Sequence, residues 1–375
     1  MKIVYIARSA IPSRDANSIH VMKMCQAFAD NGHEVIFLLP DRSSGCEPGI
    51  NDIYAYYGVK RNFQIRKFEY QHLKVKFVSQ IRQMQKSLHE LDPDLVYGRC
   101  FLGCTIACLS GYKTIYESHL PLWRSGNIKK LWFSLVTRNR NFKRLVVISE
   151  ALKTLYSNEN IISQDKLFVA HDGADKVIDF QSKAELSGEK ERLHVGYSGH
   201  LYQGKGVEVI AGVAPLMTEV NFHIIGGKEN DIAYWKSVIK SDNVFFYGFK
   251  NQTELPKYLN SFDICLLPNQ KVVLPCGKRD EKRNISDFTS PLKMFEYMAH
   301  KKAIISSDLP VLREVLNESN ALLVQCDDFQ QWADAITALQ DKNKREAIAQ
   351  QAYEDFMTSY TWKIRAEQVL SNVIK

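Results

Sequence analysis

The residues best suited to chemistry lie in one stretch, SPLKMFEYMAHKKAIISSDLPV, from Ser290 to Val311. Ser290 is a good N-cap and Pro291 suits the first helical position, so a helix is predicted to begin there. The unsatisfied amides of its first turn and the charge of Lys293 would together form a phosphate site. Glu296, about one turn further on, could accept two hydrogen bonds from a diol such as a ribose. This pattern suits a nucleoside diphosphate, but by spacing alone the simpler interpretation is a solvated pair of Lys293 and Glu296 on a surface helix.

A second candidate phosphate site lies in the stretch GYSGHLYQGKGVEVI. Gly199, Gly204 and Gly206 allow a close-fitting loop after a predicted strand, and Lys205 places a cation just before the next helix. An ordinary turn between a strand and a helix explains the glycines equally well. The G-x-G-x-x-G spacing of dinucleotide-binding loops is absent.

A fold must position both candidate sites. Along the chain, short apolar runs typical of strands alternate with helical patterns. In residues 18–30, Ile19, Met22, Ala27 and Phe28 follow a helical period, and Gly32 ends that helix. Such alternation predicts parallel sheets covered by helices, with ligands at the carboxyl ends of the strands. The predicted strands are Ile3–Ala7, Glu34–Leu39, Asp94–Tyr97, Thr114–Glu117, Leu145–Ile148 and Leu167–Ala170 in the first half, and Leu193–Ser198, Asn221–Ile225, Val244–Tyr247, Ile264–Leu267, Ala303–Ser306 and Ala321–Val324 in the second.

The domain organisation follows from length and from a polar segment near residues 180–192. A chain of 375 residues is too long for one ordinary core and suits two domains. We expect an α/β protein with two Rossmann-like, doubly wound domains that face a central cleft. Their expected bounds are 1–182 and 183–355, and residues 356–375 are expected to form a helix that packs back on the first domain.

Composition narrows the class of protein further. No apolar run approaches the roughly 18 residues of a membrane-spanning helix, and the first residues read as a strand and not as a signal peptide. A cytoplasmic location is therefore expected. Cys100, Cys104 and Cys108 are spaced by four without a C-x-x-C pair, so buried thiols are favoured over a metal site.

The net charge of +7 belongs to the first half of the chain, since residues 181–375 are nearly neutral. No acidic residue occurs between Glu117 and Glu150, where aromatic side chains are interleaved with basic ones. This pattern predicts an anionic membrane surface as a partner of residues 120–145, the alternative being a solvated basic face. Nucleic acid is a poorer fit, because no recognised binding motif accompanies the charge. The residues concerned are Trp123, Arg124, Lys129, Lys130, Trp132, Phe133, Arg138, Arg140, Lys143 and Arg144.

Several stretches, in order along nearly the whole chain, resemble the retaining glycosyltransferases of the GT-B fold, in particular the GT4 family. The stretches are NSIHVMKMCQAFADNGHEV, PDLVYGRC, TIYESH, RLVVISEALK and VAHDGAD in the first half, and GHLYQGKGVEVI, VFFYGFKNQTELPKYLNSFDICLLP and SPLKMFEYMAHKKAIISSDLPVLREVL in the second.

This resemblance implies transfer of a sugar from a nucleotide diphosphate to an acceptor hydroxyl, with retention at the anomeric carbon. Lys205 and Lys293 would neutralise the diphosphate, Glu296 would hold the ribose, and His119 would reach the donor sugar. The catalytic set is then His119, Lys205 and Glu296. Arg99 and Glu117 are candidates for the acceptor side. The remaining donor-binding candidates are Asn17, Ser18, Gly199, His200, Gly248, Phe249, Ser290, Pro291 and Leu292.

The sequence departs from the family pattern at two positions. His200 stands where the family has an arginine, and histidine lacks the bidentate fork of a guanidinium. Phe288 stands eight residues before Glu296, where many members carry an acid that touches the donor sugar, and Asp287 lies beside it. Asp287 and Phe288 are therefore the candidate sugar contacts, and the identity of the sugar is open.

The partners expected are a nucleotide-sugar donor and a sugar or lipid-linked acceptor, in polysaccharide or glycolipid synthesis at the inner face of the plasma membrane. No cofactor and no metal are expected, since lysines and a helix terminus can neutralise a leaving diphosphate and no D-x-D motif lies in a metal-binding strand context. Alternatives are a sugar-nucleotide epimerase, a phosphorylase on the same scaffold, or a non-catalytic protein that kept the fold.

Overall fold

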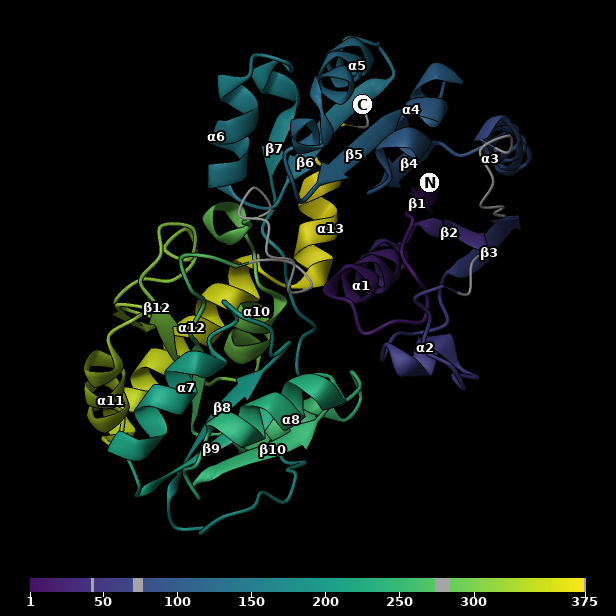
Figure 1. Cartoon of the computed structure of the whole chain (residues 1–375). Helices are drawn as coiled ribbons and strands as arrows, with labels where there is room; N and C mark the ends of the chain where they lie inside the picture. Colours follow the sequence, from purple (N-terminus) through teal and green to yellow (C-terminus); the bar gives the residue numbers. More distant parts are fainter. Residues whose placement is uncertain (42–43, 70–76, 274–283, 374–375) are drawn as a thin grey trace. The chain divides into compact units, whose positions relative to one another are not determined.

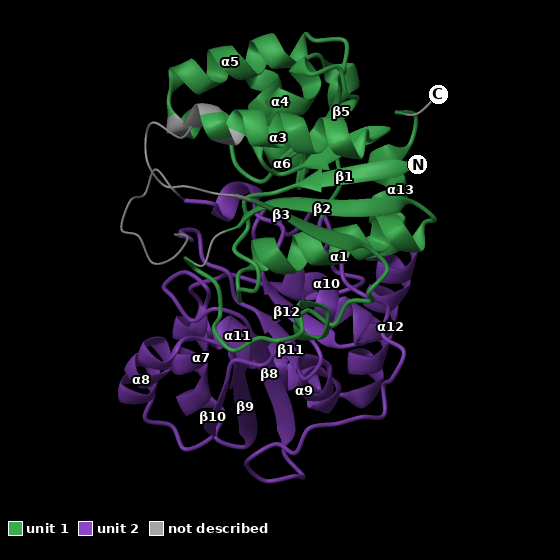
Figure 2. Cartoon of the chain, turned by 90° about the vertical axis from the view of Figure 1, so that its right-hand side faces the viewer, with its two compact units in different colours: residues 1–171, 362–375 green, residues 172–361 purple. Residues whose placement is uncertain are grey.

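A computed structural model describes residues 1–41, 44–69, 77–273 and 284–373. The chain divides into two compact units (Figure 2), residues 1–171 with 362–375 forming unit 1 and residues 172–361 forming unit 2. The division after His171 lies eleven residues before the expected domain bound at 182. The final segment that belongs to unit 1 begins at Trp362.

Unit 1 is built on a parallel sheet with strand order β3-β2-β1-β4-β5-β6-β7. Its strands are β1 (Lys2–Ile6), β2 (Glu34–Asp41), β3 (Gln64–Glu69), β4 (Leu95–Gly98), β5 (Thr114–Ser118), β6 (Phe142–Val147) and β7 (Leu167–Val169). Its α-helices are α1 (Ala16–Asp30), α2 (Ile53–Tyr56), α3 (Phe77–Leu91), α4 (Phe101–Leu109), α5 (Asn127–Thr137), α6 (Glu150–Asn158) and α13 (Trp362–Leu370), and 3-10 turns occupy η2 (Leu122–Ser125) and η3 (Gln164–Lys166).

Unit 2 repeats the design with strand order β10-β9-β8-β11-β12-β13, again parallel. Its strands are β8 (Leu193–Ser198), β9 (Val220–Ile225), β10 (Val244–Gly248), β11 (Ile264–Leu267), β12 (Ala303–Ser307) and β13 (Leu322–Val324). Its α-helices are α7 (Val207–Val213), α8 (Glu229–Val238), α9 (Leu255–Ser261), α10 (Leu292–Ala299), α11 (Phe329–Ala338) and α12 (Lys342–Ser359), and 3-10 turns occupy η4 (Ala214–Leu216) and η7 (Ser286–Phe288).

In both sheets the strand order reverses beside the first strand, between β1 and β4 and between β8 and β11. This is the doubly wound arrangement, in which ligands bind outside the carboxyl ends of the strands at the point of reversal. The chain leaves β8 through the glycine loop after Ser198, and it leaves β4 and β5 toward Arg99 and His119. The predicted pair of doubly wound α/β domains is confirmed.

The twelve strands expected from the sequence are all present, with ends that differ by three residues at most. The strand that the sequence did not predict is β3, QIRKFE, at the edge of the unit 1 sheet. An edge strand buries less of its surface than a central one, so its polar residues hide the apolar pattern on which prediction depends. Cys100, Cys104 and Cys108 are buried, as expected for structural thiols.

The last helix of the chain, α13, packs against α1 within unit 1 (Figure 1, yellow and purple). Arg144 on β6 holds its carboxyl end, since its guanidinium donates to the carbonyls of Gln368, Val369 and Ser371 at 3.3, 2.9 and 2.7 Å. At the other end, the Asn31 side chain donates to the carbonyl of Lys363 at 3.0 Å. The bonds from Arg144 satisfy carbonyls at the carboxyl end of α13, where a helix leaves its last carbonyls open. None of the described helices is both long enough and apolar enough to cross a bilayer.

We predict that Arg144→Met loosens α13 at a cost of about 2 kcal/mol or more, because buried carbonyls lose a charged donor. Hydrogen exchange of the α13 amides is the suitable measurement, since a chain of two units need not unfold in one step. Arg140→Met is the matched control, because Arg140 is exposed in the loop after α5. Equal exchange rates in the two variants would contradict this account of Arg144.

Candidate functional site

The loop that follows β8 requires glycine at several positions. Gly199, Gly204 and Gly206 have φ angles of +139°, +86° and +97°, which other residues rarely adopt. A Cβ on Gly204 would lie 2.1 Å from the carbonyl oxygen of Val272, and one on Gly206 equally close to that of Pro268. The glycines therefore let this loop press against the chain that follows β11, which explains them more fully than an ordinary turn does.

Side chains from three elements fix this loop in place. The hydroxyl of Tyr197 donates to the carbonyl of His200 at 2.7 Å, and the indole of Trp235 donates to that of Leu201 at 2.7 Å. The backbone amide of Gly204 donates to Oε1 of Glu208 at 3.1 Å. His200 stacks on Tyr202, with ring centroids 5.6 Å apart. A loop held at so many points keeps its backbone amides in position before any ligand arrives.

Lys205 lies within this loop, and its environment disfavours the charged form. Its Nζ lies 5.4 Å from the centre of the Tyr202 ring. Burial lowers the pKa of Lys205 from 10.5 to about 8. An anion beside Nζ would favour the charged form and raise this pKa again, so Lys205 is suited to an anionic ligand.

The helix that was expected to have Ser290 as its N-cap begins one residue later than expected. Pro291 occupies the N-cap position and α10 starts at Leu292, so the predictions of Ser290 as N-cap and Pro291 as first helical residue are wrong. The Ser290 hydroxyl instead accepts a hydrogen bond from the backbone amide of Asp172 at 3.0 Å. Because Ser290 contacts another backbone segment, the helix start is fixed by tertiary structure and not by a cap. Pro291 and Leu292 are half-buried at this terminus.

Lys293 is the most unusual residue of unit 2. Its side chain is buried, Nζ lies 3.9 Å from the centre of the Tyr197 ring, and no hydrogen-bond partner for Nζ is found among the described residues. A Cβ placed on Gly199 would lie 3.7 Å from Nζ, so the ammonium group faces the glycine loop. Burial, and then the charge of Lys205, hold the pKa of Lys293 well below 10.5. The alternative of a solvated surface pair is therefore wrong for Lys293.

Glu296 lies one turn further along α10 and is half-buried. It contributes a carboxylate close enough to Lys293 to raise the pKa of that lysine, against the larger effect of burial. The sequence placed a phosphate-binding cation and a diol-binding carboxylate on successive turns, and the structure keeps that order along α10. Their part in donor binding stays a prediction.

The two candidate sugar contacts differ in exposure. Phe288 is fully buried, whereas Asp287, in the same 3-10 turn η7, is exposed. A fully buried ring offers no surface to a sugar, so Phe288 is wrong as a direct contact. Asp287 is the residue of this pair that a ligand can reach.

Gly248 ends β10 with a φ of +68°, and its carbonyl accepts from the amide of Gly226 at 2.7 Å. This bond ties the carboxyl ends of β9 and β10 together. Phe249 follows it and is half-buried. Both residues thus lie at the carboxyl ends of the strands, the same edge of the sheet that carries the glycine loop.

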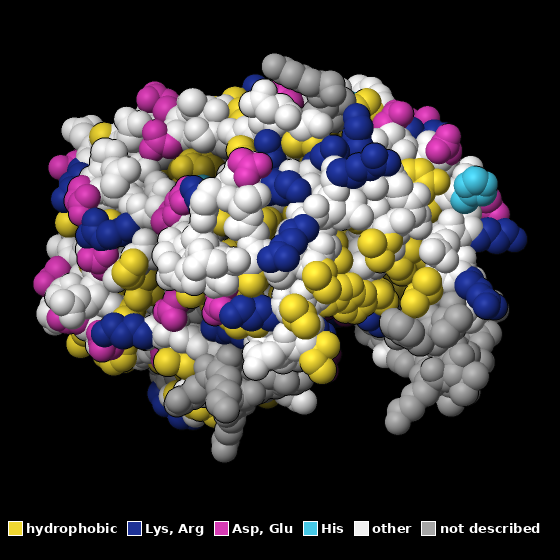
Figure 3. Space-filling model, turned by 90° about the horizontal axis from the view of Figure 1, so that it is seen from above, with side chains coloured by type: hydrophobic (Ala, Val, Ile, Leu, Met, Phe, Trp, Pro, Cys, Tyr) yellow, Lys and Arg dark blue, Asp and Glu magenta, His cyan; other side chains and the backbone are white. Residues whose placement is uncertain are grey.

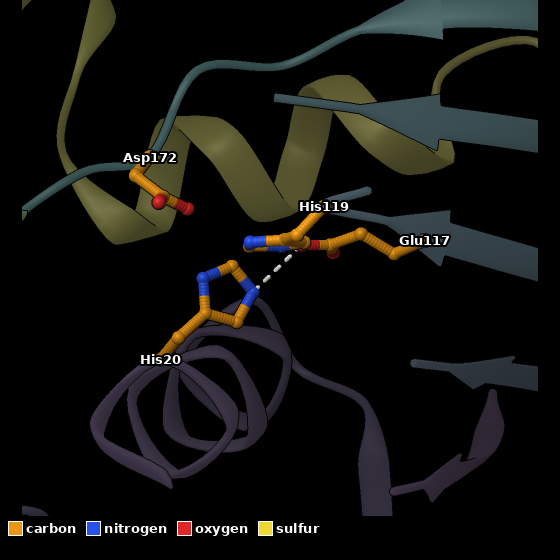
Figure 4. A group of neighbouring side chains, drawn as sticks. All are labelled: His20, Glu117, His119 and Asp172. Carbon is orange, nitrogen blue, oxygen red and sulfur yellow. Dashed lines mark hydrogen bonds and ion pairs between the residues drawn. The ribbon is translucent and has the colours of Figure 1, made fainter. Parts of the chain in front are cut away.

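In unit 1 a buried carboxylate, Glu117 at the end of β5, organises a polar cluster. Its Oε1 lies 2.6 Å from Nε2 of His119 and 2.8 Å from Nε2 of His20 on α1 (Figure 4). Arg365 on α13 approaches the same carboxylate, with contacts of 3.1 and 3.3 Å. The hydroxyl of Tyr97 donates to Glu117 from β4. Glu117 was a candidate for the acceptor side, and because its side chain is fully buried, a direct contact with an acceptor is not available to it in this structure.

The charges in this cluster favour an ionised Glu117. Burial opposes ionisation, but Arg365 and then His20 and His119 hold the pKa of Glu117 well below 4.5. An ionised carboxylate only accepts hydrogen bonds, so Nε2 of His119 donates to it and the ring is held in one orientation. His119 keeps part of its side chain exposed, 18%, whereas His20 has 1%. Glu117 therefore positions the one imidazole of the cluster that a ligand can reach.

The same cluster contains groups that could ligate a metal. Ligand atoms of His20, Glu117 and His119 lie within 4.8 Å of one another. The Arg365 guanidinium, however, already supplies a positive charge to that carboxylate. A further cation would be repelled there, so the arrangement fits the positioning of His119 better than metal binding.

The other predicted residues of unit 1 lie in separate surroundings. Asn17 and Ser18 belong to the first turn of α1 and not to the preceding loop. Asn17 is exposed, but Ser18 is buried and donates to the carbonyl of Ala10 at 2.8 Å, so its hydroxyl has a structural partner. Arg99 is half-buried after β4, and its Nη1 has no partner among the described residues.

Sequence reasoning missed His20, Arg365 and Tyr97. His20 lies between the apolar positions of α1, and Tyr97 reads as an ordinary strand residue. Arg365 follows Glu117 by 248 residues in the chain. No local pattern links these three residues to Glu117, because they come from segments that only the tertiary structure brings together.

Both halves of the chain match models of known protein families. Residues 18–176 match a family model described as glycosyltransferase family 4, and residues 192–342 match one described as glycosyl transferases group 1. The first match includes His20, Glu117 and His119, and the second includes the glycine loop and α10. A protein of Klebsiella pneumoniae, described as an uncharacterized 41.2 kDa protein in the cps region, is 27% identical over 116 residues. That match spans 29% of this chain and about a third, 32%, of the relative.

Solved structures match over the whole length. A glycosyltransferase from Rickettsia africae has a TM-score of 0.74 at 13% identity, covering 99% of this chain and 97% of that one. HepE of Anabaena, in complex with UDP and glucose, has a TM-score of 0.71 at 15% identity, covering 100% and 99%. The lipopolysaccharide outer core galactosyltransferase WaaB has a TM-score of 0.66 at 15% identity, with the same coverage.

These structures identify the fold as GT-B, with two parallel-sheet α/β domains, as predicted. Together the fold and the two family matches support a glycosyltransferase of this family.

We predict that Arg365→Met destabilises unit 1 by about 3–5 kcal/mol, because it leaves the Glu117 carboxylate buried beside a missing partner. The double variant with Glu117→Gln should recover part of that loss, since neither charge then remains. Thermal and chemical unfolding measure both effects, and Lys363→Met, an exposed change on the same helix, is the control. A loss no larger than that of the control would show that the pair is not important for stability.

We predict that Lys293→Met stabilises the ligand-free protein near neutral pH. A buried lysine whose pKa is depressed binds fewer protons in the folded state than in the unfolded state. Stability of the wild type therefore rises with pH from the depressed pKa up to 10.5, where the unfolded lysine also becomes neutral. The advantage of the methionine variant should shrink over that range.

Melting temperatures at several pH values provide the measurement for Lys293→Met. The control is Lys344→Met, at an exposed position on α12. A variant less stable than wild type across the whole range would rule out a costly buried charge at Lys293.

Proposed function

We propose that this protein is a glycosyltransferase that moves a sugar from a nucleotide-diphosphate donor to an acceptor hydroxyl with retention at the anomeric carbon. The observation that carries the proposal is Lys293, a buried ammonium group without a hydrogen-bond partner among the described residues, facing a glycine loop. Such a group is costly in the free protein and is compensated when an anion binds. The family match over residues 192–342 supports the same proposal.

The diphosphate would occupy the space between the glycine loop and the start of α10. Lys205 and Lys293 would neutralise it, together with loop amides such as that of Gly199 and the N-terminal amides of α10. Glu296 would accept hydrogen bonds from the ribose hydroxyls. His200, which replaces the family arginine, stacks on Tyr202, so the two lysines would carry the charge stabilisation without a metal ion.

In the proposed reaction, the bond between the anomeric carbon and the donor phosphate oxygen breaks. The bond to the acceptor oxygen forms on the same face, and the acceptor proton passes to the departing phosphate oxygen. Because the leaving group gains negative charge, the two lysines would stabilise the transition state more than the ground state. His119, oriented by Glu117, would donate a hydrogen bond to the transferred sugar, and Asp287 is the candidate for a second contact.

Known relatives suggest the classes of donor and acceptor. HepE was crystallised with UDP and glucose, and WaaB is named for transfer of galactose to the outer core of lipopolysaccharide. We propose a nucleoside-diphosphate hexose as donor and a polysaccharide or glycolipid hydroxyl as acceptor. The donor class is testable directly, because a nucleoside diphosphate that binds the folded protein raises its melting temperature.

A non-catalytic protein of the same fold is the alternative favoured by a specific observation. The family acid that contacts the sugar is replaced by Phe288, whose ring is fully buried. Such a protein would bind nucleotide without turnover. The two functions are distinguished by measuring the nucleoside diphosphate that the wild type releases from the donor. Release through hydrolysis or sugar transfer supports the enzyme, and binding without release supports the non-catalytic protein.

We predict that Lys205→Ala lowers kcat/KM for the donor by about a hundred-fold or more, as loss of one charge-stabilising group does in other enzymes. Glu296→Ala should lower it by about ten-fold or more, because charged hydrogen bonds to the ribose are lost. The control is Lys344→Ala on α12, which should behave as wild type. Nuclear magnetic resonance of the product should give the same anomeric configuration as the donor. Inversion of configuration, or wild-type turnover by both site variants, would contradict the assignment.

A further inference from the structure

The helix α5 of unit 1 exposes apolar side chains that a helix normally buries. Ile128, Leu131, Trp132 and Leu135 follow one another at helical spacing, with exposed fractions of 84%, 65%, 37% and 58%. The opposite face supplies Phe133, Val136 and Thr137 to the interior. The exposed side chains therefore form a continuous apolar stripe on a helix that is already packed on its other side.

Cations flank this stripe on both sides. By helical geometry Lys129 lies next to Trp132, and Arg138 extends the row that Leu131 and Leu135 begin. Arg140 follows in the next loop, and all three cations are exposed. None of the ion pairs found in the described parts of the chain involves them. Figure 3 views the face of the molecule that carries α5, and it shows hydrophobic side chains gathered there with lysines and arginines beside them.

The structure changes which residues of segment 120–145 form this surface. Arg144 is buried against α13 and Phe133 is in the core, so neither belongs to it. Trp123 packs edge-on against Tyr156, with centroids 4.9 Å apart. Lys130 is paired with Glu159. The expected basic and aromatic surface is thus replaced by an aliphatic stripe, with Trp132 at its edge and cations on its borders.

We propose that this surface of unit 1 binds an anionic lipid bilayer, with the apolar stripe of α5 inserted at the boundary between headgroups and acyl chains. The apolar side chains would leave water, and Lys129, Arg138 and Arg140 would contact the negatively charged headgroups. The charge argues for an anionic partner, because the chain has no acidic residue from Ser118 to Ser149. This inference goes beyond the proposed transfer reaction and does not depend on it.

A bilayer fits this surface better than a protein does. The apolar residues stand on one face of a single helix and are not arranged as a groove that would receive a helix or a strand. Tryptophan beside an aliphatic stripe suits the amphipathic zone of a membrane interface. Cations on both borders of the stripe match a plane of uniform negative charge, whereas protein partners usually present charges of both signs.

Vesicle flotation of the 375-residue protein tests this proposal. Binding is expected to vesicles that contain phosphatidylglycerol and to fall with added salt, while vesicles of phosphatidylcholine alone bind far less. The variant Lys129→Gln/Arg138→Gln/Arg140→Gln should weaken binding about five-fold for each charge, or roughly a hundred-fold in total. Ile128→Ser/Leu131→Ser/Leu135→Ser should weaken it at least as much, because the inserted apolar area is lost.

A matched control is available in unit 2. Ile178→Ser/Leu216→Ser/Val238→Ser changes three side chains that are also exposed, at 95%, 54% and 45%, and should leave flotation unchanged. Unchanged melting temperatures and unchanged nucleotide binding would show that all three variants fold. A blue shift of tryptophan emission on vesicles, lost in Trp132→Phe, would place α5 at the interface.

Three results would overturn the proposal. The wild type could fail to float with either vesicle, or the unit 2 control could lose as much binding as the α5 variant. The wild type could also form a dimer that the α5 variant dissolves while vesicles do not bind, which would make a second copy of the chain the partner. A wild type that transfers sugar but does not float would reject the membrane surface alone. A wild type that floats but does not bind nucleotide would reject the proposed activity alone.

Discussion

A buried ion pair between Glu117 and Arg365 joins the end of a central strand to the last helix of the chain. A carboxylate in the interior of a sheet is stable only when opposite charge and hydrogen-bond donors surround it. Arg365 supplies the charge, Tyr97 on β4 donates a hydrogen bond, and the Nε2 atoms of His20 on α1 and of the neighbouring His119 lie beside the same carboxylate. Glu117 therefore orients the partly exposed imidazole of His119, and its ion pair with Arg365 adds to the contacts that hold α13 in unit 1.

Unit 2 also buries an ionisable side chain, but it does so without an ion pair among the described residues. Lys293 is buried against the Tyr197 ring without a counter-charge at hydrogen-bond distance, and Lys205 lies in the neighbouring loop. The folded protein bears the desolvation of these lysines, and an anion would recover it on binding. The glycine loop makes this arrangement possible, because glycine alone lets the backbone approach so closely. Buried lysines with lowered pKa values are common where proteins stabilise anionic charge, and they reduce the stability of the free protein.

The surface of α5 is similar to the Lys293 site in one respect, since groups that the fold leaves unsatisfied are the basis for proposing a partner. One face of this helix is required for packing, and the other exposes aliphatic side chains between cations. The sequence located the segment by its charge. In the structure the exposed apolar residues of this segment are mainly aliphatic. Phe133 and Arg144 are buried, and Trp123 packs against Tyr156.

The sequence by itself determined the two parallel sheets, the glycine loop with Lys205, and the order of Lys293 and Glu296 on one helix. These features are local, since they follow from apolar periodicity and from residues a few positions apart. Only the tertiary structure shows that Lys293 and Phe288 are buried and that Asp287 is exposed. It also shows that the Ser290 hydroxyl accepts a hydrogen bond from the amide of Asp172 and does not cap α10. It also brought Arg365 to Glu117. Each of these outcomes depends on which distant segments pack together, and the pattern of neighbouring residues carries no record of that.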